Sequence, residues 1–279
     1  MLYMVSKKML IARFVAVFIL VLGAISMLIP FIWMISTSLK NDPEVFTFPP
    51  TWLPETIQWS NYLDAFGVAN FGRVFFNSTY VALVTTVLGL LFMSMAGYAF
   101  AKFRFWGREV IFILLLATMM IPFQVTMIPI YILFRELDLL NSYTGLIAPN
   151  VATAFGIFMM RQFMQSLPDE LMDAARIDGA GEARIFFKIM LPLVKAPLAA
   201  LGIFTFMFSW NNYFLPLVII TNESYKTLPL LISSLSAGLY VQSWPLVMAA
   251  ATIATLPIII VFFFAQKYFI EGMALTGIK

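Results

Sequence analysis

Long uncharged apolar runs alternate with short charged segments along this chain of 279 residues. Six of these runs contain no Asp, Glu, Lys or Arg and reach the ~20 residues that a helix needs to cross a bilayer. They cover residues 14–36, 77–101, 110–134, 142–160, 196–220 and 244–265. Because lipid offers no partners to backbone groups, and the alternation of barrel strands is missing, each run predicts a helix. The predicted fold class is an all-α polytopic membrane protein with six transmembrane helices.

The composition agrees with this class and narrows the chemistry. Hydrophobic residues make up 62% of the chain and charged residues 11%, with a mean hydropathy of +0.92. The absence of cysteine excludes disulfides and thiol chemistry, and the absence of histidine removes the commonest general base and metal ligand. The net charge of +3 is better explained by orientation in a bilayer than by nucleic acid.

The distribution of Lys and Arg predicts the orientation. If the N-terminus is cytoplasmic, thirteen of these residues fall on the cytoplasmic side and four on the external side, namely Lys40, Arg73, Arg135 and Lys226. This asymmetry follows the positive-inside rule and predicts cytoplasmic N- and C-termini. The first run follows Lys7, Lys8 and Arg13 and has no cleavage site behind it, so we expect an uncleaved signal anchor.

The same pattern predicts three parts along the chain. Residues 1–72 would form the signal-anchor span and a first external loop rich in Pro and Trp. Residues 73–266 would form a five-span core that contains a charged cytoplasmic loop at 161–195. Residues 267–279 would form a cytoplasmic tail, and residues 221–243 a second external loop.

The spans lack the groups that most membrane chemistry requires. An ion-driven transporter places ionisable residues inside its spans, and these spans have none. An intramembrane enzyme would need a nucleophile with a base, or a metal site, at that depth, so we expect no catalytic residue, no metal and no enzyme. The chain also lacks a GxxxxGK[ST] phosphate-binding loop. Energy for uphill transport would therefore come from another polypeptide.

One charged stretch interrupts the apolar pattern, DELMDAARIDGAGEARIFFKIMLPLVKAPL at residues 169–198. Ser166 and Asp169 have the spacing of a capping box and, with Pro168 in the first turn, predict the start of a helix. That helix would present one side made of Leu171, Ala174, Ala175 and Asp178. Gly179 and Gly181 predict its end, because glycine tolerates the backbone of a helix stop.

A second helix is expected at residues 182–190, with Ile185, Phe186 and Ile189 on one face and Leu191–Pro192 as its end. The stretch thus predicts a short helix–turn–helix. A solvated surface hairpin explains such a loop equally well from the residues alone. The small side chains of Ala174 and Ala175 would allow another surface to approach closely and mildly favour docking.

The loop also carries a spaced motif. Asp173-Ala174-Ala175, three residues, Gly179, nine residues and Ile189-x-Leu191-Pro192 resemble the signature of permease subunits of bacterial ABC importers. That signature reads EAA, three residues, G, nine residues, I-x-L-P, so Asp173 replaces the usual Glu. The segments SLKNDPEVFTFPP, NYLDAF, SWNNYFLPL and KYFIEGMALTGIK resemble the smaller six-span permease of maltose-type carbohydrate importers, so the resemblance covers essentially the whole chain.

This resemblance implies a function and a set of partners. The motif would form a coupling helix that docks on an ATPase subunit, through Asp173, Ala174, Ala175, Gly179, Ile189, Leu191 and Pro192. Two cytoplasmic ATPases would use ATP and Mg, which this chain itself would not bind, and a second permease would complete the pore. A solute-binding protein would contact the second external loop, and the tail Tyr268–Lys279 would reach the ATPase pair.

Uncharged polar residues inside the spans are candidates for the translocation path: Gln124, Asn150, Ser209, Asn211 and Asn212, with Thr153 beside them. Sugars need hydrogen bonds and flat apolar faces, so amides near Trp210 and Tyr213 suit a neutral polyol. Singly, each could equally join helices to one another. Prolines inside the spans, Pro122, Pro129, Pro216 and Pro257, predict kinks. A stand-alone facilitator or channel remains the alternative function, and an intramembrane enzyme a distant third.

Overall fold

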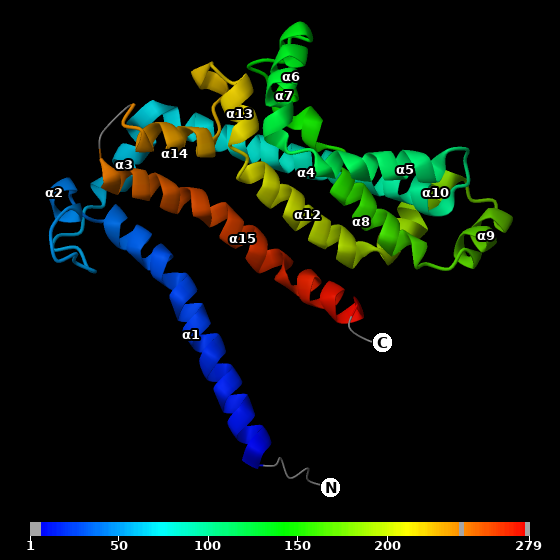
Figure 1. Cartoon of the computed structure of the whole chain (residues 1–279), viewed down its shortest axis with the longest axis horizontal. Coiled ribbons are helices and arrows are strands. Elements are labelled where there is room, and N and C mark those ends of the chain that lie inside the picture. The colour runs from blue at the N-terminus through cyan, green and yellow to red at the C-terminus, as the bar shows by residue number, and fades with distance from the viewer. Residues whose placement is uncertain (1–6, 240–242, 277–279) are drawn as a thin grey trace. The chain divides into compact units, whose positions relative to one another are not determined.

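The computed structural model describes residues 7–239 and 243–276, and every regular element within these ranges is a helix (Figure 1). The predicted all-α fold class is confirmed. The first helices are α1 Lys7–Ser38, α2 Asp42–Val45, α3 Ser60–Gly67, α4 Phe71–Lys102, α5 Arg108–Ala117, α6 Phe123–Glu136, α7 Tyr143–Ile147 and α8 Ala154–Gln165. The later ones are α9 Glu170–Ile177, α10 Glu182–Ile185, α11 Leu191–Leu193, α12 Lys195–Trp210, α13 Phe214–Ile219, α14 Leu228–Ser236 and α15 Trp244–Thr276.

Three helices are long and apolar enough to cross a membrane without a break, α1, α4 and α15. Three further candidates are pairs of helices bent at a short break. The bend is 104° between α5 and α6, 40° between α7 and α8, and 84° between Glu182–Leu193 and α12. If each bent pair is one span, the described chain has up to six spans, the number that the apolar runs predict.

The breaks show where composition alone misplaces the elements. The run 110–134 turns sharply at Pro122, which lacks the N–H that would continue the helix. The run 196–220 is interrupted between Trp210 and Phe214, where α12 ends and α13 begins. Pro129 and Pro257, in contrast, lie inside the continuous helices α6 and α15. Apolarity therefore identifies the runs, while their internal geometry depends on local groups.

The chain divides into two compact units, and the larger one contains Ala69–Ser233 and Ala254–Lys279. Its centre is α4, which packs against α8 and α12 (Figure 1). A Cβ atom added at Gly97 of α4 would lie 2.6 Å from the Cβ of Met160 on α8. Gly156 of α8 likewise leaves room for the side chain of Met93 on α4. The two helices approach this closely because small residues stand at their contact, as is common between membrane helices.

The smaller unit contains Met1–Val68 and Ser234–Ile253. Within it, the last turns of α1 are joined to the loop that carries α2 and to the start of α3. Asn61 donates hydrogen bonds to the carbonyls of Ser38 and Lys40, at 2.9 and 2.8 Å, and the amide of Gln58 donates to the carbonyl of Leu39 at 2.8 Å. The loop after α1, which is predicted to be external, is therefore an ordered structure fixed to the end of that helix.

Candidate functional site

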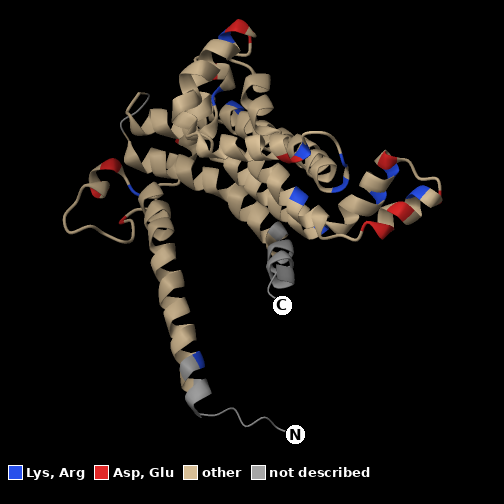
Figure 2. Ribbon diagram, turned by 45° about the vertical axis from the view of Figure 1, so that its right-hand side comes forward, with Lys and Arg blue, Asp and Glu red and all other residues tan. Residues whose placement is uncertain are grey.

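The charged stretch forms a helix–turn–helix, as the sequence predicts. It consists of α9, a turn at 178–181, α10, one wide π-helical segment at Phe186–Met190, and α11. Figure 2 shows that acidic and basic residues gather on this loop, whereas the long helices are almost free of them. The loop is therefore the main charged feature of the larger unit.

The start of α9 differs from the prediction. The helix begins at Glu170 with Asp169 as its N-cap, and the Asp169 side chain makes no capping bond. The Ser166 hydroxyl instead donates to the carbonyl of Phe163 at 2.8 Å, so it belongs to the end of α8. The predicted capping box is wrong, and Pro168 lies outside the helix rather than in its first turn. The Ser166 and Asp169 side chains bind other partners, Phe163 and Lys102, and the spacing in the sequence does not reveal this.

The end of α9 is the turn that Gly179 predicts. Gly179 has φ +80°, a left-handed conformation that costs a residue with a side chain about 1 kcal/mol or more. Its N–H donates to the carbonyl of Arg176 at 3.0 Å, and the N–H of Ala180 donates to the carbonyl of Ala175 at 2.9 Å. This pair of bonds is a Schellman motif, which satisfies the last carbonyls of the helix. The glycine is needed for the backbone, since open space surrounds it.

The second helix continues beyond its predicted end. Leu191–Pro192 does not stop it, because residues 191–193 are still helical and the sharp bend follows at Val194. A proline ring in a regular helix clashes with the carbonyl four residues earlier. The wider π-helical segment directly before Pro192 provides a place where the ring is accommodated. The prediction that this dipeptide ends the helix is therefore wrong.

The apolar side of the loop shares one core with the spans. Met172, Ile185 and Met190 are almost completely buried, and they belong to the same cluster as Met93 of α4 and Met160 of α8. A hairpin that was merely solvated would not bury these side chains against the transmembrane helices. The loop is thus packed onto the spans as one body.

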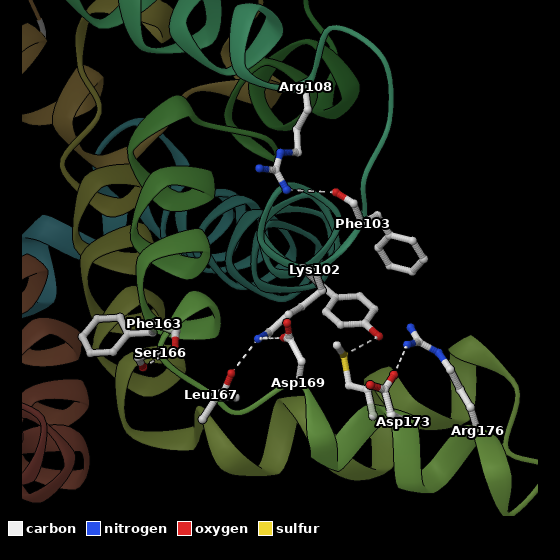
Figure 3. A network of polar contacts seen from close by, with 11 residues as sticks. Lys102, Phe103, Arg108, Phe163, Ser166, Leu167, Asp169, Asp173 and Arg176 are labelled. Atoms are coloured by element: carbon white, nitrogen blue, oxygen red, sulfur yellow. Dashed lines mark hydrogen bonds and ion pairs between the residues drawn. The ribbon is translucent and has the colours of Figure 1, made fainter.

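The beginning of the loop is fixed to the end of α4 by Lys102 (Figure 3). Its side chain is 3% exposed, and its amine donates to the carbonyl of Leu167 at 2.6 Å and to the carboxylate of Asp169 at 2.5 Å. The hydrogen bond from Lys102 lowers the pKa of Asp169 below its usual range, which keeps this carboxylate charged. One buried cation therefore ties the loop to α4.

A second group of charges joins α9, α10 and α4. Arg176 donates to Asp173 at 2.9 Å, as Figure 3 shows, and to Glu182 at 2.8 Å. The hydrogen bond to Glu182 is the main reason that the pKa of Arg176 is raised. Glu182 also accepts a hydrogen bond of 3.1 Å from the hydroxyl of Tyr98 on α4. These bonds close the turn between the two helices and attach it to the span.

The residues predicted to contact an ATPase are not equivalent. Ala174 and Gly179 are exposed, and so is Pro192. Ala175 is buried in the core of the loop itself, and Ile189 and Leu191 are half-buried against that core. Asp173 is exposed and paired with Arg176. Of the predicted contact residues, Asp173, Ala174, Gly179 and Pro192 are thus the ones offered to another molecule.

Sequence reasoning missed the residues that hold this loop in place. Lys102 and Tyr98 come from a span 65 or more positions earlier than their partners. Arg161 counts in the sequence only as a cytoplasmic charge, yet it is buried, forms two hydrogen bonds of 2.9 Å to Glu109 and lies 3.8 Å from the ring of Phe112. The one signal in the sequence was that Lys102 and Arg161 each directly follow an apolar run.

The predicted path residues are spread over different environments. A cavity of about 780 Å³ in the larger unit is lined by Asn150 and Thr153, together with aromatic residues such as Phe155, Phe204 and Phe208. Asn150 donates to the carbonyl of Leu146 at 3.1 Å, and Thr153 caps α8. With Thr118 and Thr205 also in its lining, this cavity combines four uncharged polar residues with flat apolar walls.

The remaining candidates lie outside the lining of that cavity. Gln124 is exposed on α6, and Ser209 is half-buried near the end of α12. Asn211 and Asn212 shape the break after α12, where Asn211 donates to the carbonyl of Met207 and Asn212 accepts from the amide of Leu215.

Trp210 and Tyr213, the aromatic residues expected to bind a sugar together with these amides, form hydrogen bonds within the protein instead. Trp210 is buried, and its indole N–H donates to the carbonyl of Ala254 at 3.0 Å. The Tyr213 hydroxyl accepts a bond of 3.1 Å from Ser233. No group of three or more acidic residues that could hold a metal ion occurs in the described part of the chain.

These features define an all-helical polytopic membrane protein with a charged loop built into the core of its spans. Residues 89–274 match the family of binding-protein-dependent transport system inner membrane components. The chain belongs to this family, and it is therefore an inner membrane transport component.

Several relatives are similar over nearly the whole chain. The arabinooligosaccharides transport system permease protein AraQ of Halalkalibacterium halodurans is 40% identical over 88% of this chain and 86% of its own length. The lactose transport system permease protein LacG of Rhizobium radiobacter is 38% identical, covering 91% and 92%. The sn-glycerol-3-phosphate transport system permease protein UgpE of Pectobacterium atrosepticum is 38% identical, covering 91% and 93%. These names are those of transport permeases rather than enzymes.

A solved structure has the same fold. It is a chain of a bacterial ABC transporter involved in the import of the acidic polysaccharide alginate, with a TM-score of 0.82 and 27% identity over 96% of this chain and all of that one.

Proposed function

We propose that this chain is one of the permease subunits of an ATP-driven importer and moves a carbohydrate across the cytoplasmic membrane. The family and the names of the relatives, which include an arabinooligosaccharide and a lactose permease, support this substrate class. The uncharged spans and the cavity with Asn150, Thr153 and aromatic walls favour a neutral saccharide, because hydroxyls take hydrogen bonds and sugar faces pack on rings. Gln124, Ser209, Asn211 and Asn212 stay candidate path residues.

The energy would enter through the α9–α10 loop. Its apolar side is part of the core of α4 and α8, so a force on its exposed side would move those helices with it. Ala174 and Gly179 stand at the exposed turn, and the bonds of Lys102 and Glu182 prevent the loop from moving alone. This joint packing is the observation that carries the proposal.

The partners follow from the proposed function. A binding protein outside the membrane would deliver the solute, a second permease would complete the pore, and two ATPase subunits would bind ATP and Mg. The excess of Lys and Arg on one side supports a cytoplasmic position for the α9–α10 loop and both termini. In this proposal residues 1–72 form the first span and loop, residues 73–266 the five-span permease core, and residues 267–279 the tail. Residues 277–279 of the tail lie outside the described residues.

Substitution of Gly179 by valine tests the loop. A β-branched residue at φ +80° is strained, so the turn between α9 and α10 must change its course. We expect Gly179→Val to abolish uptake of the transported sugar, and to remove stimulation of ATP hydrolysis by the binding protein, while the chain still inserts into the membrane.

Gly181 provides a matched control two residues away. It has φ −72°, and nothing lies within 4 Å of an added Cβ, so valine fits there without strain. Gly181→Val should retain most of the uptake. Undiminished uptake by Gly179→Val would refute the coupling role of the loop. Uptake by the chain without any ATPase subunit would instead support the facilitator.

A further inference from the structure

The segment 46–59 of the first external loop exposes apolar side chains to an unusual extent. Its one charged residue is Glu55. Its exposed large hydrophobic residues are Phe46, Phe48, Trp52, Leu53, Ile57 and Trp59. Soluble proteins seldom expose so many large apolar side chains in one short segment, and such a patch marks an interaction surface.

Two charged residues next to this segment, Lys40 and Glu44, are turned inward, whereas Asp42 and Glu55 are exposed. Lys40 is 1% exposed, its amine donates to the carbonyl of Thr51, and it lies 4.8 Å from the ring centroid of Trp33. Glu44 is buried as well, and its carboxylate accepts from the amide of Glu55 at 3.0 Å and from the hydroxyl of Thr51 at 3.3 Å. Water-facing loops have the reverse arrangement, because charged groups are usually solvated. Polar groups inside and apolar groups outside suit a surface that faces lipid.

The segment also lies at the right depth for a membrane surface. The rings of Trp33 on α1 and Trp52 are 5.3 Å apart, edge to face, and the Ser36 hydroxyl donates to the Trp52 carbonyl. Trp33 stands five residues before the end of α1 at Ser38, which is about 7–8 Å along the helix axis. The segment therefore folds back beside the last turns of α1, as Figures 1 and 2 both show.

We infer that residues 46–59 rest in the boundary between headgroups and acyl chains, in the leaflet that contains the C-terminal end of α1. α1 is an apolar span whose side chains are exposed from Arg13 to Ile32, and the segment lies beyond the end of that surface. Trp52 and Trp59 have the amphipathic rings that are enriched at this level of a bilayer. The partner is thus the phospholipid interface, and the loop anchors the end of the first span. This inference concerns the loop and the bilayer and does not depend on transport.

The absence of native cysteine allows a direct test. Single cysteines at Phe48 and Leu53, which are 93% and 80% exposed, would carry a nitroxide in the full chain, purified with its accompanying subunits and placed in phosphatidylethanolamine–phosphatidylglycerol nanodiscs. Collision rates with oxygen, which is concentrated in lipid, and with a water-soluble nickel chelate report depth. Ile25→Cys inside α1 serves as the lipid reference, and Glu136→Cys at the exposed end of α6 as the water reference.

We expect an oxygen-to-nickel ratio at Phe48→Cys and Leu53→Cys severalfold above that at Glu136→Cys and below that at Ile25→Cys. A ratio equal to that of Glu136→Cys would overturn the inference, because the segment would be in water. Low collision rates with both probes would overturn it in favour of coverage by another protein subunit. If the ratio rises only when the binding protein is added, that protein covers the segment, and the inference also fails.

A second measurement avoids any label on the segment. Phospholipids brominated near the headgroup quench tryptophans that lie at that depth. We expect Trp59→Phe, which keeps an aromatic ring, to reduce the quenchable part of the fluorescence. An unchanged quenchable fraction would contradict the proposed position.

Discussion

The charged loop at 169–192 and the loop at 39–66, which is predicted to be external, arrange their side chains in opposite ways. In the charged loop, Ile185 and Met190 are fully buried while Asp173 and Arg176 are exposed. In the external loop, the cation of Lys40 is buried while the aromatic and aliphatic residues of segment 46–59 are exposed. Both arrangements follow from apolar groups leaving water. The difference lies in what surrounds each loop, water for the first and, by our inference, lipid for the second.

The comparison also separates two mechanical roles. The charged loop shares its core with α4 and α8, so it transmits movement to the spans. The external loop is fixed to the end of α1 through Asn61, Ser36 and Lys40, so it holds one helix end in place. Matched substitutions in the two loops can therefore test whether the burial of a side chain, rather than its residue type, decides how much its loss destabilises the protein.

The largest difference is expected between two truncations to alanine. Ile185→Ala leaves a cavity in the core that joins the charged loop to the spans, which costs about 2–5 kcal/mol. Leu53→Ala removes a side chain that is 80% exposed and should change stability by no more than about 0.5 kcal/mol. Thermal unfolding of the detergent-solubilised transporter measures both. Similar shifts in the unfolding temperature of the two variants would show that the burial of these side chains does not determine stability.

The bond between the charged loop and α4 should have a smaller effect. Lys102→Met keeps an unbranched apolar stem but leaves the Leu167 carbonyl and the Asp169 carboxylate without their donor. The Leu167 carbonyl, which is half-buried, loses its donor at a cost of about 1 kcal/mol, whereas water can replace the lost bond to the exposed Asp169 carboxylate. We expect reduced coupling, measured as sugar moved per ATP hydrolysed.

Asp169→Asn is the matched control for that bond. The amide can still accept from Lys102, and the bond to the Leu167 carbonyl is intact, so its effect should be the weaker of the two. If Asp169→Asn impaired coupling more than Lys102→Met, the charge of Asp169 would matter to a partner rather than to the loop itself.

The sequence predicted the features that depend on neighbouring residues. The apolar runs located the spans, and Gly179 located the turn, because a helix stop of this kind requires glycine at one position. The kink predicted at Pro122 is confirmed by the 104° bend there, whereas the break after Trp210 was not predicted, since tertiary packing decides whether such a residue interrupts a helix. Pro129 stays inside a continuous helix, although it is also a proline in an apolar run.

The bonds that hold the candidate site could not be predicted from local pattern. Lys102 and Tyr98 reach their partners across 65 and 84 positions of the chain. Ala174 and Ala175 looked equivalent as small neighbours, but one is exposed and the other is buried. Which face of a short helix turns inward depends on the core beneath it, and that core comes from distant spans.

The smallest effect is expected from Asp173→Glu, which restores the glutamate of the family signature. The Asp173 carboxylate pairs with Arg176 three residues later on the same helix, and both side chains are partly exposed, so the pair is worth about 0.2–1 kcal/mol at most. Arg176 is also held by Glu182, which keeps the guanidinium in place whichever acid stands at 173. Asp173→Glu should therefore retain uptake within about twofold, a factor that corresponds to roughly 0.4 kcal/mol.

Asp173→Ala separates the two roles that this carboxylate could have. If the carboxylate only supports the helix, the alanine variant should behave almost like Asp173→Glu, because the bond between Arg176 and Glu182 remains. If the carboxylate binds the ATPase, Asp173→Ala should lose the stimulation of ATP hydrolysis by the binding protein while thermal stability stays unchanged. We expect the second result, since the carboxylate is exposed beside Ala174 on the side of α9 that faces away from the core.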